Sequence, residues 1–251
     1  MPRLVVLGDS LTFHGPEGPL LLADPRLYPN VLAAALARQT HEPWDVAVVA
    51  RAGWSLRDVW LALQKDVHLQ QQVLNGAAAI VLAVGSTDPL PVGIPRAWSA
   101  LVPYVRPTSA RRALRRGIDR AHPHLVRATG ASLRWTPASV YVHCWRKSVT
   151  ALRLFAPDAS LCAVLPGIHV GPYYGGSNRH RAAYADLTRA LAQELDVPLV
   201  DLAALTQPWL GALNPDGLHW PFGLHDAVAD ALAAALLGGP QERQVDVEQI
   251  S

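Results

Sequence analysis

Five short apolar runs, separated by longer stretches with helical periodicity, are the feature that most limits the fold of this 251-residue chain. Each run is bounded by turn residues, as is typical of strands that are buried on both faces. The runs are Leu4–Leu7, Asp45–Ala50, Ala78–Val84, Leu161–Leu165 and Pro198–Leu202. Because strands and helices alternate, the sequence predicts a five-stranded parallel sheet between two layers of helices, a three-layer α/β/α fold.

The spacing of apolar residues predicts the helices between these runs. Four are expected at about 29–40, 56–74, 178–195 and 221–237. Residues 86–160 are too many for one crossover helix, and they contain two helical patterns, at about 108–130 and 137–155. We therefore expect a single α/β domain over 1–240, a helical insertion at about 89–157 beside the crevice at the carboxyl ends of the strands, and a polar tail at 241–251.

Composition narrows the class of protein. Half of the residues are hydrophobic, enough for one well-buried domain of about 200–250 residues. No run of about 20 apolar residues predicts a membrane span, and the first strand follows Met1 too closely for a signal peptide. The two cysteines, Cys144 and Cys162, favour a reduced cytoplasmic protein with buried free thiols, although they could pair. Neither has the spacing of a metal ligand, so no metal site is expected.

Charge is distributed unevenly along the chain. The formal net charge is only +2, which by itself indicates no polyanion partner, yet residues 106–153 hold 11 of the 22 lysines and arginines and one acid, Asp119. This basic segment suggests a face that binds anions, and an ordinary solvated helix face explains it equally well. The candidates for anion binding are Arg111, Arg112, Arg115 and Arg116.

Two short motifs near the ends of the domain carry the residue types of nucleophilic catalysis. Ser10 lies in Gly8-Asp9-Ser10, directly after the first apolar run, where Asp9 can brace the turn. His219 follows Asp216 by three residues, just before the last predicted helix. A serine becomes a nucleophile when an adjacent histidine takes its proton and an acid orients that histidine. We therefore predict a Ser10, His219 and Asp216 catalytic set.

With these motifs the chain resembles the GDSL/SGNH family of serine esterases and acyltransferases, which implies a flavodoxin-like SGNH fold. The resemblance also implies an oxyanion hole formed by the amides of Ser10 and Gly53. The third block of the family reads Gly-x-Asn-Asp, whereas residues 85–88 here read Gly-Ser-Thr-Asp. Thr87 thus stands where an asparagine amide normally donates, and its hydroxyl can donate with a shorter reach. Asp88 is expected to brace the loop.

Within the family, residues 8–16, 85–91 and 216–222 resemble a subgroup of octanoyltransferases linked to methylglucose lipopolysaccharide synthesis. This resemblance implies transfer of an octanoyl group from octanoyl-CoA to a glucosylglycerate acceptor, with no cofactor beyond the acyl-CoA substrate. Both substrates are anionic, and guanidinium groups bind carboxylates and phosphates bidentately. His14 is a further candidate for substrate binding, and the apolar run Leu20–Leu22 could line the acyl chain.

Three other functions remain open from the sequence. An esterase or deacylase with the same acyl-enzyme chemistry would release the acyl group to water. A binding protein without activity would tolerate the altered third block, although the intact serine, histidine and aspartate argue against it. A nucleic-acid binder would use the basic segment and show strong salt dependence; no nucleic-acid partner is expected. The sequence does not determine the oligomeric state.

Overall fold

The computed structural model describes residues 1–95, 98 and 101–238, so the predicted polar tail at 241–251 lies outside the described residues. Its centre is one sheet of five parallel strands in the order β4-β1-β5-β6-β7. The strands are β1 (Arg3–Gly8), β4 (Asp45–Ala50), β5 (Ala79–Ala83), β6 (Ser160–Leu165) and β7 (Leu199–Asp201). The five predicted strands are confirmed, and their order is that of flavodoxin-like folds.

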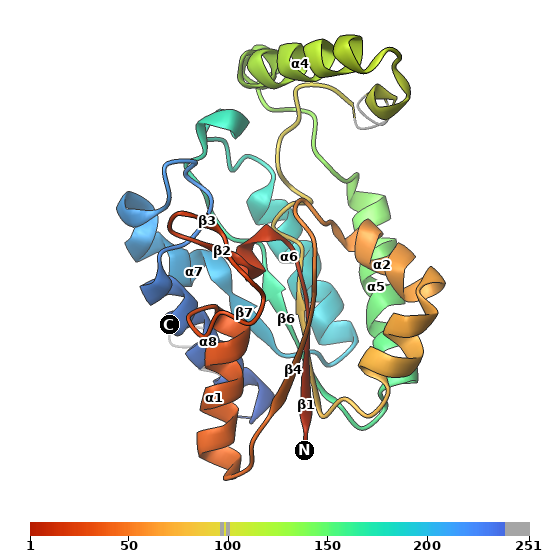
Figure 1. The fold of residues 1–251 in the computed structure, drawn as a ribbon, viewed down its shortest axis with the longest axis vertical. Coiled ribbons are helices and arrows are strands. Elements are labelled where there is room, and N and C mark those ends of the chain that lie inside the picture. The colour runs from red at the N-terminus through yellow and green to blue at the C-terminus, as the bar shows by residue number, and fades with distance from the viewer. Residues whose placement is uncertain (96–97, 99–100, 239–251) are drawn as a thin grey trace, which may run out of the picture.

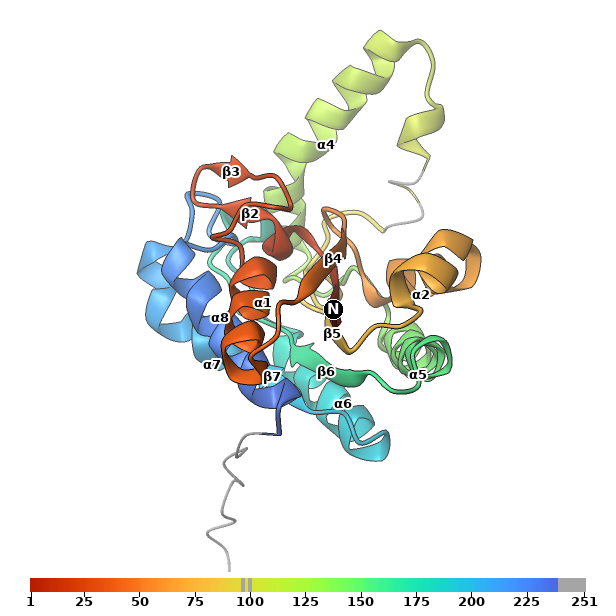
Figure 2. The ribbon, with the colours of Figure 1, turned by 60° about the horizontal axis from the view of Figure 1, so that its bottom comes forward.

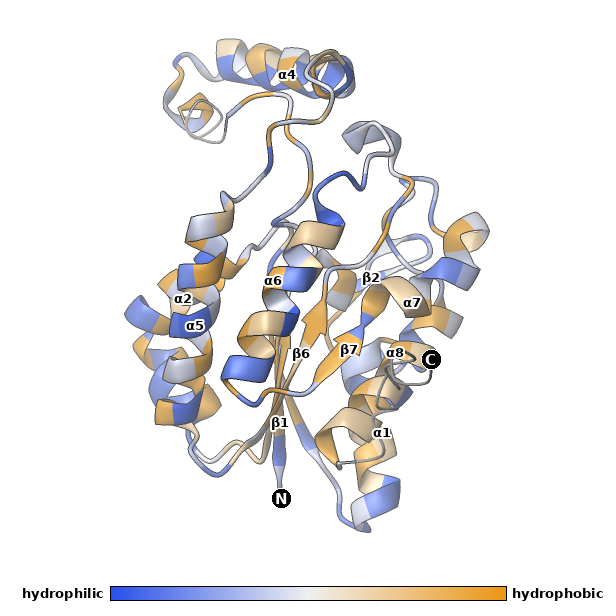
Figure 3. Cartoon of the chain, turned by 180° about the vertical axis from the view of Figure 1, so that it is seen from behind, coloured by the Kyte–Doolittle hydropathy of each residue, from blue (hydrophilic) through white to orange (hydrophobic). Residues whose placement is uncertain are grey.

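Helices cover both faces of this sheet (Figure 1). One layer contains α2 (Leu56–Lys65), α5 (Ala138–Phe155) and α6 (Arg181–Glu194), and the other α1 (Tyr28–Thr40) and α8 (Phe222–Leu236). Side chains of β1 alternate between two cores, with Val5 and Leu7 in the first and Leu4 and Val6 in the second. This alternation explains why the strands are apolar throughout. The inner strand β6 and the edge strand β7 are accordingly hydrophobic in Figure 3.

Local capping explains where the helices depart from their predicted lengths. The helix expected at 56–74 ends at Lys65, because Asp66 has an extended backbone and its carboxylate accepts the amide of Leu69, starting a separate turn at Leu69–Leu74. After β7, the carboxylate of Asp201 caps the short helix α7 (Leu202–Thr206), which apolar periodicity did not predict.

The predicted insertion at 89–157 contains two parts with different roles. The helix α5 packs against α2 in the outer layer and contributes Tyr141, Trp145 and Val149 to the first core, so it is the crossover helix between β5 and β6. The helix α4 (Thr108–Ala128) instead projects beyond the carboxyl end of the sheet (Figures 1 and 2). A short antiparallel contact at Pro91 and Arg134 closes the base of this projection. We call residues 91–135 the α4 arm.

The basic residues of segment 106–153 are also divided between α5 and the α4 arm. On α5, Arg146 forms an ion pair with Glu194 at 2.7 Å, and Arg153 donates to the carbonyl of Asp196 at 3.0 Å, so these two arginines join α5 to the α6 region. The α4 arm carries the remaining excess of arginines, and Figure 3 shows hydrophilic residues along α4 beside hydrophobic ones. Fewer basic side chains are therefore available to bind an anion than the charge of the whole segment suggested.

Both cysteines are buried free thiols, as predicted, and they lie in different cores, Cys144 in the first and Cys162 in the second. Within residues 1–95, 98 and 101–238, no helix is long and apolar enough to cross a membrane. The same residues contain no group of three or more His, Cys, Asp or Glu side chains that could hold a metal ion.

Candidate active site

Ser10 is held in a tight turn at the carboxyl end of β1. Asp9 caps this turn, and its Oδ1 accepts the amide of Leu11 at 2.9 Å, as the motif predicted. Only glycine fits at position 8, because a Cβ there would lie 1.9 Å from Oγ1 of Thr12. The turn lies where the order of strands reverses beside β1, which is the place where such sheets bind their ligands.

His219 connects Ser10 with Asp216. Its Nε2 lies 2.9 Å from Oγ of Ser10, and its Nδ1 lies 2.6 Å from Oδ2 of Asp216. Because an ionised carboxylate can only accept, Nδ1 carries the proton and Nε2 is free to accept from the serine. Burial raises the pKa of Asp216, but hydrogen bonds from His219 and from the amides of His219 and Leu218 outweigh burial and bring that pKa below its usual value. Asp216 therefore stays ionised and fixes the tautomer.

A close backbone contact fixes the loop that carries Asp216 and His219. Gly217 has a φ of +68°, and a Cβ there would lie 2.7 Å from the amide nitrogen of Gly171. The carbonyl of Gly217 also accepts the amide of Val170 at 2.8 Å. The loop after β6 therefore supports the loop before α8, and only a glycine at position 217 allows the two backbones to approach this closely.

His14, a predicted substrate-binding residue, packs on His219, and its role in binding stays a prediction. The rings of His14 and His219 stack with centroids 3.8 Å apart and an angle of 19° between their planes. The backbone of His14 is held by His225, a residue that the sequence analysis did not single out. Its Nε2 donates to the carbonyl of His14 at 3.0 Å, and its Nδ1 accepts the amide of Tyr28. Burial lowers the pKa of His225 to about 4, so its ring is neutral.

His14 lies in a small hairpin that the sequence did not predict, formed by β2 (His14–Gly15) and β3 (Gly18–Pro19). The side chain of Asn214 donates to the carbonyl of Gly15 at 2.8 Å and ties the hairpin to the Asp216 loop. Just beyond it, Leu21 is 84% exposed. The apolar run that was expected to line an acyl chain thus lies at the surface.

Two backbone amides remain candidates for the oxyanion hole. Gly53 has a φ of +70° in the turn after β4, next to the end of β1, where the amide of Arg51 donates to the carbonyl of Gly8 at 3.3 Å. The amides of Gly53 and Ser10 have no acceptor among the described residues. Both are therefore available to a developing negative charge, and their role stays a prediction.

Thr87 is buried, but the structure gives its hydroxyl another partner. Its Oγ1 donates to Oδ2 of Asp9 at 3.3 Å. A threonine hydroxyl has one proton, so this proton is not available to an oxyanion while Asp9 is ionised. Burial raises the pKa of Asp9 to about 6, against the opposing hydrogen bonds of Leu11 and Thr87. Neighbouring Asp88 braces α2, as expected, by accepting the amide of Leu56 at 3.0 Å.

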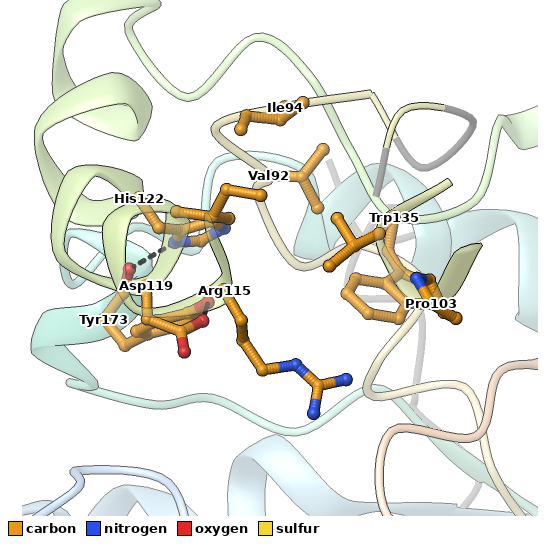
Figure 4. Close-up of a pocket in the computed structure, with 10 residues that line it drawn as sticks. Val92, Ile94, Pro103, Arg115, Asp119, His122, Trp135 and Tyr173 are labelled. Carbon is orange, nitrogen blue, oxygen red and sulfur yellow. Dashed lines mark hydrogen bonds between the residues drawn. The ribbon is translucent and has the colours of Figure 1, made fainter. Parts of the chain in front are cut away.

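The four arginines predicted to bind anions do not form one site. Arg111 donates to the carbonyl of Pro103 at 3.1 Å, and Arg115 lines a cavity beneath α4 (Figure 4). Arg112 and Arg116 are exposed on α4. Among the described residues, no hydrogen bond or ion pair joins any of the four to Ser10, Asp216 or His219. Their role in binding stays a prediction.

Comparison with known proteins agrees with this fold. The chain belongs to the GDSL-like lipase/acylhydrolase family, whose model matches residues 6–227. It is 37% identical over 246 residues to a diglucosylglycerate octanoyltransferase of Mycobacterium tuberculosis, with 96% of each chain covered. It is 35% identical over 237 residues to an enzyme of that name from Mycolicibacterium hassiacum, with 94% and 95% covered. The solved lipase/acylhydrolase of Enterococcus faecalis shares the fold, with a TM-score of 0.63 at 13% identity over 95% and 96% of the two chains.

Proposed function

We propose that this protein transfers an octanoyl group from octanoyl-CoA to a glucosylglycerate-type sugar through an ester on Ser10. The observation that carries the proposal is the continuous chain of contacts from Ser10 through His219 to Asp216, with distances of 2.9 Å and 2.6 Å. The two octanoyltransferase relatives support the acyl group and the acceptor. The choice of CoA as donor rests on the chemistry of a thioester, which is a reactive acyl source for a serine nucleophile.

In the first half-reaction Ser10 attacks the thioester carbonyl. Nε2 of His219 takes the serine proton as the C–O bond forms, and Asp216 stabilises the resulting imidazolium. The amides of Ser10 and Gly53 donate hydrogen bonds to the carbonyl oxygen as it becomes negatively charged. Each such donor contributes about 3–4 kcal/mol to lowering the barrier. The C–S bond then breaks, and His219 returns its proton to the departing thiolate.

In the second half-reaction a sugar hydroxyl replaces the thiol. His219 takes the hydroxyl proton as the oxygen attacks the carbonyl carbon of the Ser10 ester. The bond between that carbon and Oγ of Ser10 then breaks, His219 returns the proton to Oγ, and the acylated sugar is released. Water can follow the same route, and the enzyme is then an esterase. The ratio of acylated sugar to free octanoate therefore separates the two activities.

The test is mass spectrometry of the intact protein and of its products after incubation with octanoyl-CoA, with and without glucosylglycerate acceptors. We expect one octanoyl adduct on the wild-type protein, no adduct on Ser10→Ala, and loss of the adduct with formation of octanoylated sugar when acceptor is added. An adduct that only water removes, at every acceptor concentration, would replace the transferase by an esterase. Full turnover in a folded Ser10→Ala protein would contradict a mechanism through an ester on Ser10.

A further inference from the structure

A cavity of about 290 Å³ lies beneath α4, and we call it the α4 pocket. Most of its wall is apolar. The apolar residues are Val92, Ile94, Val102, Pro103, Ile118 and Trp135. Figure 4 shows side chains from the segment before α4 and from the segment after it facing one another across this space. Liquid water occupies about 30 Å³ per molecule, so the cavity has roughly the volume of ten water molecules. This is enough room for a chain of eight carbon atoms.

Two walls of the α4 pocket continue into the loops of the candidate active site. On one side, Val92 follows the loop that contains Thr87, and its amide donates to the carbonyl of Leu133 at 3.1 Å. On the other side, the ring of Tyr173 stacks on His122 of α4 with centroids 4.1 Å apart. Nδ1 of His122 also donates to the carbonyl of Tyr173 at 2.9 Å.

The loop with Tyr173 is the loop that supports the catalytic one. A Cβ on Gly171 would lie 3.0 Å from the carbonyl oxygen of Asp216, so the two backbones are in contact. Tyr173 thus contacts α4 through its ring and lies two positions from a residue that packs on Asp216. The α4 pocket is therefore next to the catalytic loops, although it belongs to the projecting arm.

Its polar groups are gathered at one side. Arg115, Asp119, His122 and Tyr173 lie together there, and in Figure 4 the guanidinium of Arg115 extends away from His122. The hydroxyl of Tyr173 donates to Oδ1 of Asp119 at 3.4 Å. An apolar interior with a few polar groups at its rim is the usual form of a site for an amphiphilic small molecule.

We infer that the α4 pocket holds the aliphatic chain of the acyl group while its carbonyl carbon is at Ser10; this inference rests on the proposed function. The apolar run Leu20–Leu22 offers no enclosed alternative, since Leu21 is 84% exposed. Each methylene that leaves water contributes about 0.8 kcal/mol, or about fourfold in affinity. The pocket therefore makes the enzyme selective for chain length.

The experiment fills the pocket and measures chain-length selectivity. Ile118→Trp places a large ring in the α4 pocket, and Gly117→Trp places the same ring on the same helix, where a Cβ meets no atom within 4 Å. Rates of acylation of Ser10 are measured for C2, C4 and C8 acyl-CoA and for the matching nitrophenyl esters. Ile118→Ala, which enlarges the pocket, is measured with C8 and C10 chains.

We expect Ile118→Trp to lose tenfold or more of kcat/KM with C8 donors of both kinds while the C2 rate is nearly unchanged. Gly117→Trp should keep the wild-type profile, and Ile118→Ala should shift the preference towards C10. An unchanged C8 preference in Ile118→Trp, with a wild-type circular dichroism spectrum, would overturn the inference. A loss confined to CoA thioesters would also overturn it, because the pocket would then hold part of CoA.

A binding measurement separates this inference from the proposed function. Octanoate is titrated into Ser10→Ala and into Ser10→Ala with Ile118→Trp by calorimetry. If octanoate binds only to the protein with the open pocket while no acceptor is ever acylated, the pocket assignment stands and the proposed transferase fails. If octanoate binds equally to both proteins while acyl transfer proceeds in wild type, the transferase stands and the pocket assignment fails.

Discussion

The catalytic end of the sheet and the α4 arm differ in how their side chains are held. At the catalytic end, His219 is 8% exposed, contacts Ser10, Asp216 and His14, and lies on a loop whose backbone contacts the loop after β6. On the arm most residues of α4 are exposed, and only His122 and Val126 of this helix are buried. The proposed chemistry thus lies in the packed part of the molecule, and the pocket proposed to select the acyl chain lies in a projecting element.

The largest expected effects come from the catalytic end. Ser10→Ala and His219→Ala should each lower kcat by several orders of magnitude, because triad members act as a unit. For the same reason the double variant should be about as slow as either single variant. Steady-state kinetics on octanoyl-CoA and on a short nitrophenyl ester measure this. A double variant much slower than both would show that the two residues act independently.

Asp9 tests how burial of a carboxyl group at the catalytic end changes the free energy of unfolding with pH. Its pKa is raised to about 6 by burial, so the folded protein binds this proton more tightly than the unfolded chain does. Stability is therefore lost as pH rises from about 4 to about 6, by about 3 kcal/mol in total at 1.36 kcal/mol per pKa unit. Asp9→Asn keeps an acceptor for Leu11 and removes this loss.

The measurement is urea unfolding of Asp9→Asn and wild type between pH 4 and pH 8. We expect the two proteins to be similar near pH 4 and the variant to be more stable above pH 6. Asp158→Asn, in an exposed turn before β6, is the control and should follow wild type throughout. A wild-type protein that gains stability over this range relative to Asp9→Asn would contradict the predicted sign.

Gly217 tests whether the close contact between its backbone and Gly171 affects kcat separately from the positive φ of Gly217. Gly217→Ala has a strained φ and a clash with Gly171, whereas Gly176→Ala has the same kind of φ, +66°, and open space around it. A displaced catalytic group can cost about 100-fold in rate. We therefore expect a loss of about that size in kcat for Gly217→Ala and little change for Gly176→Ala. Equal losses would assign the effect to backbone strain alone.

The strands and the Ser10, His219 and Asp216 geometry were predictable, because continuous apolar runs and short motif spacings leave a local record in the sequence. What escaped prediction depends on contacts between distant segments. The support of His14 by His225 joins a hairpin to the last helix, and the bond between Thr87 and Asp9 joins two loops. Apolar periodicity likewise could not show that α5 covers the sheet while α4 leaves it, since both read as amphipathic helices.

His14 sharpens the comparison, because its ring stacks on His219 although His14 does not belong to the predicted triad. Stacked rings contribute about 0.5–1.5 kcal/mol, so His14→Ala should lower kcat by up to about tenfold through a less well-oriented His219. His14→Phe keeps a ring in the stack and should restore most of the rate. If KM for the sugar acceptor rises in both variants while kcat holds, His14 binds substrate, as the sequence suggested.

The smallest expected effect belongs to the arm. Arg115 lies at the rim of the α4 pocket and is exposed, as is Arg116 on another face of the same helix. Exposed ion pairs contribute about 0.2–1 kcal/mol and are screened by salt, so Arg115→Gln should raise KM for octanoyl-CoA about two- to fivefold at low salt and less at high salt. Arg116→Gln should behave as wild type, and neither variant should change attack on a neutral ester.

If both variants raise KM equally, the charge of the whole arm attracts the substrate, and the anion is not bound at one position. If neither does, the positive charge of α4 is a solvated surface, and selection depends on the apolar pocket alone.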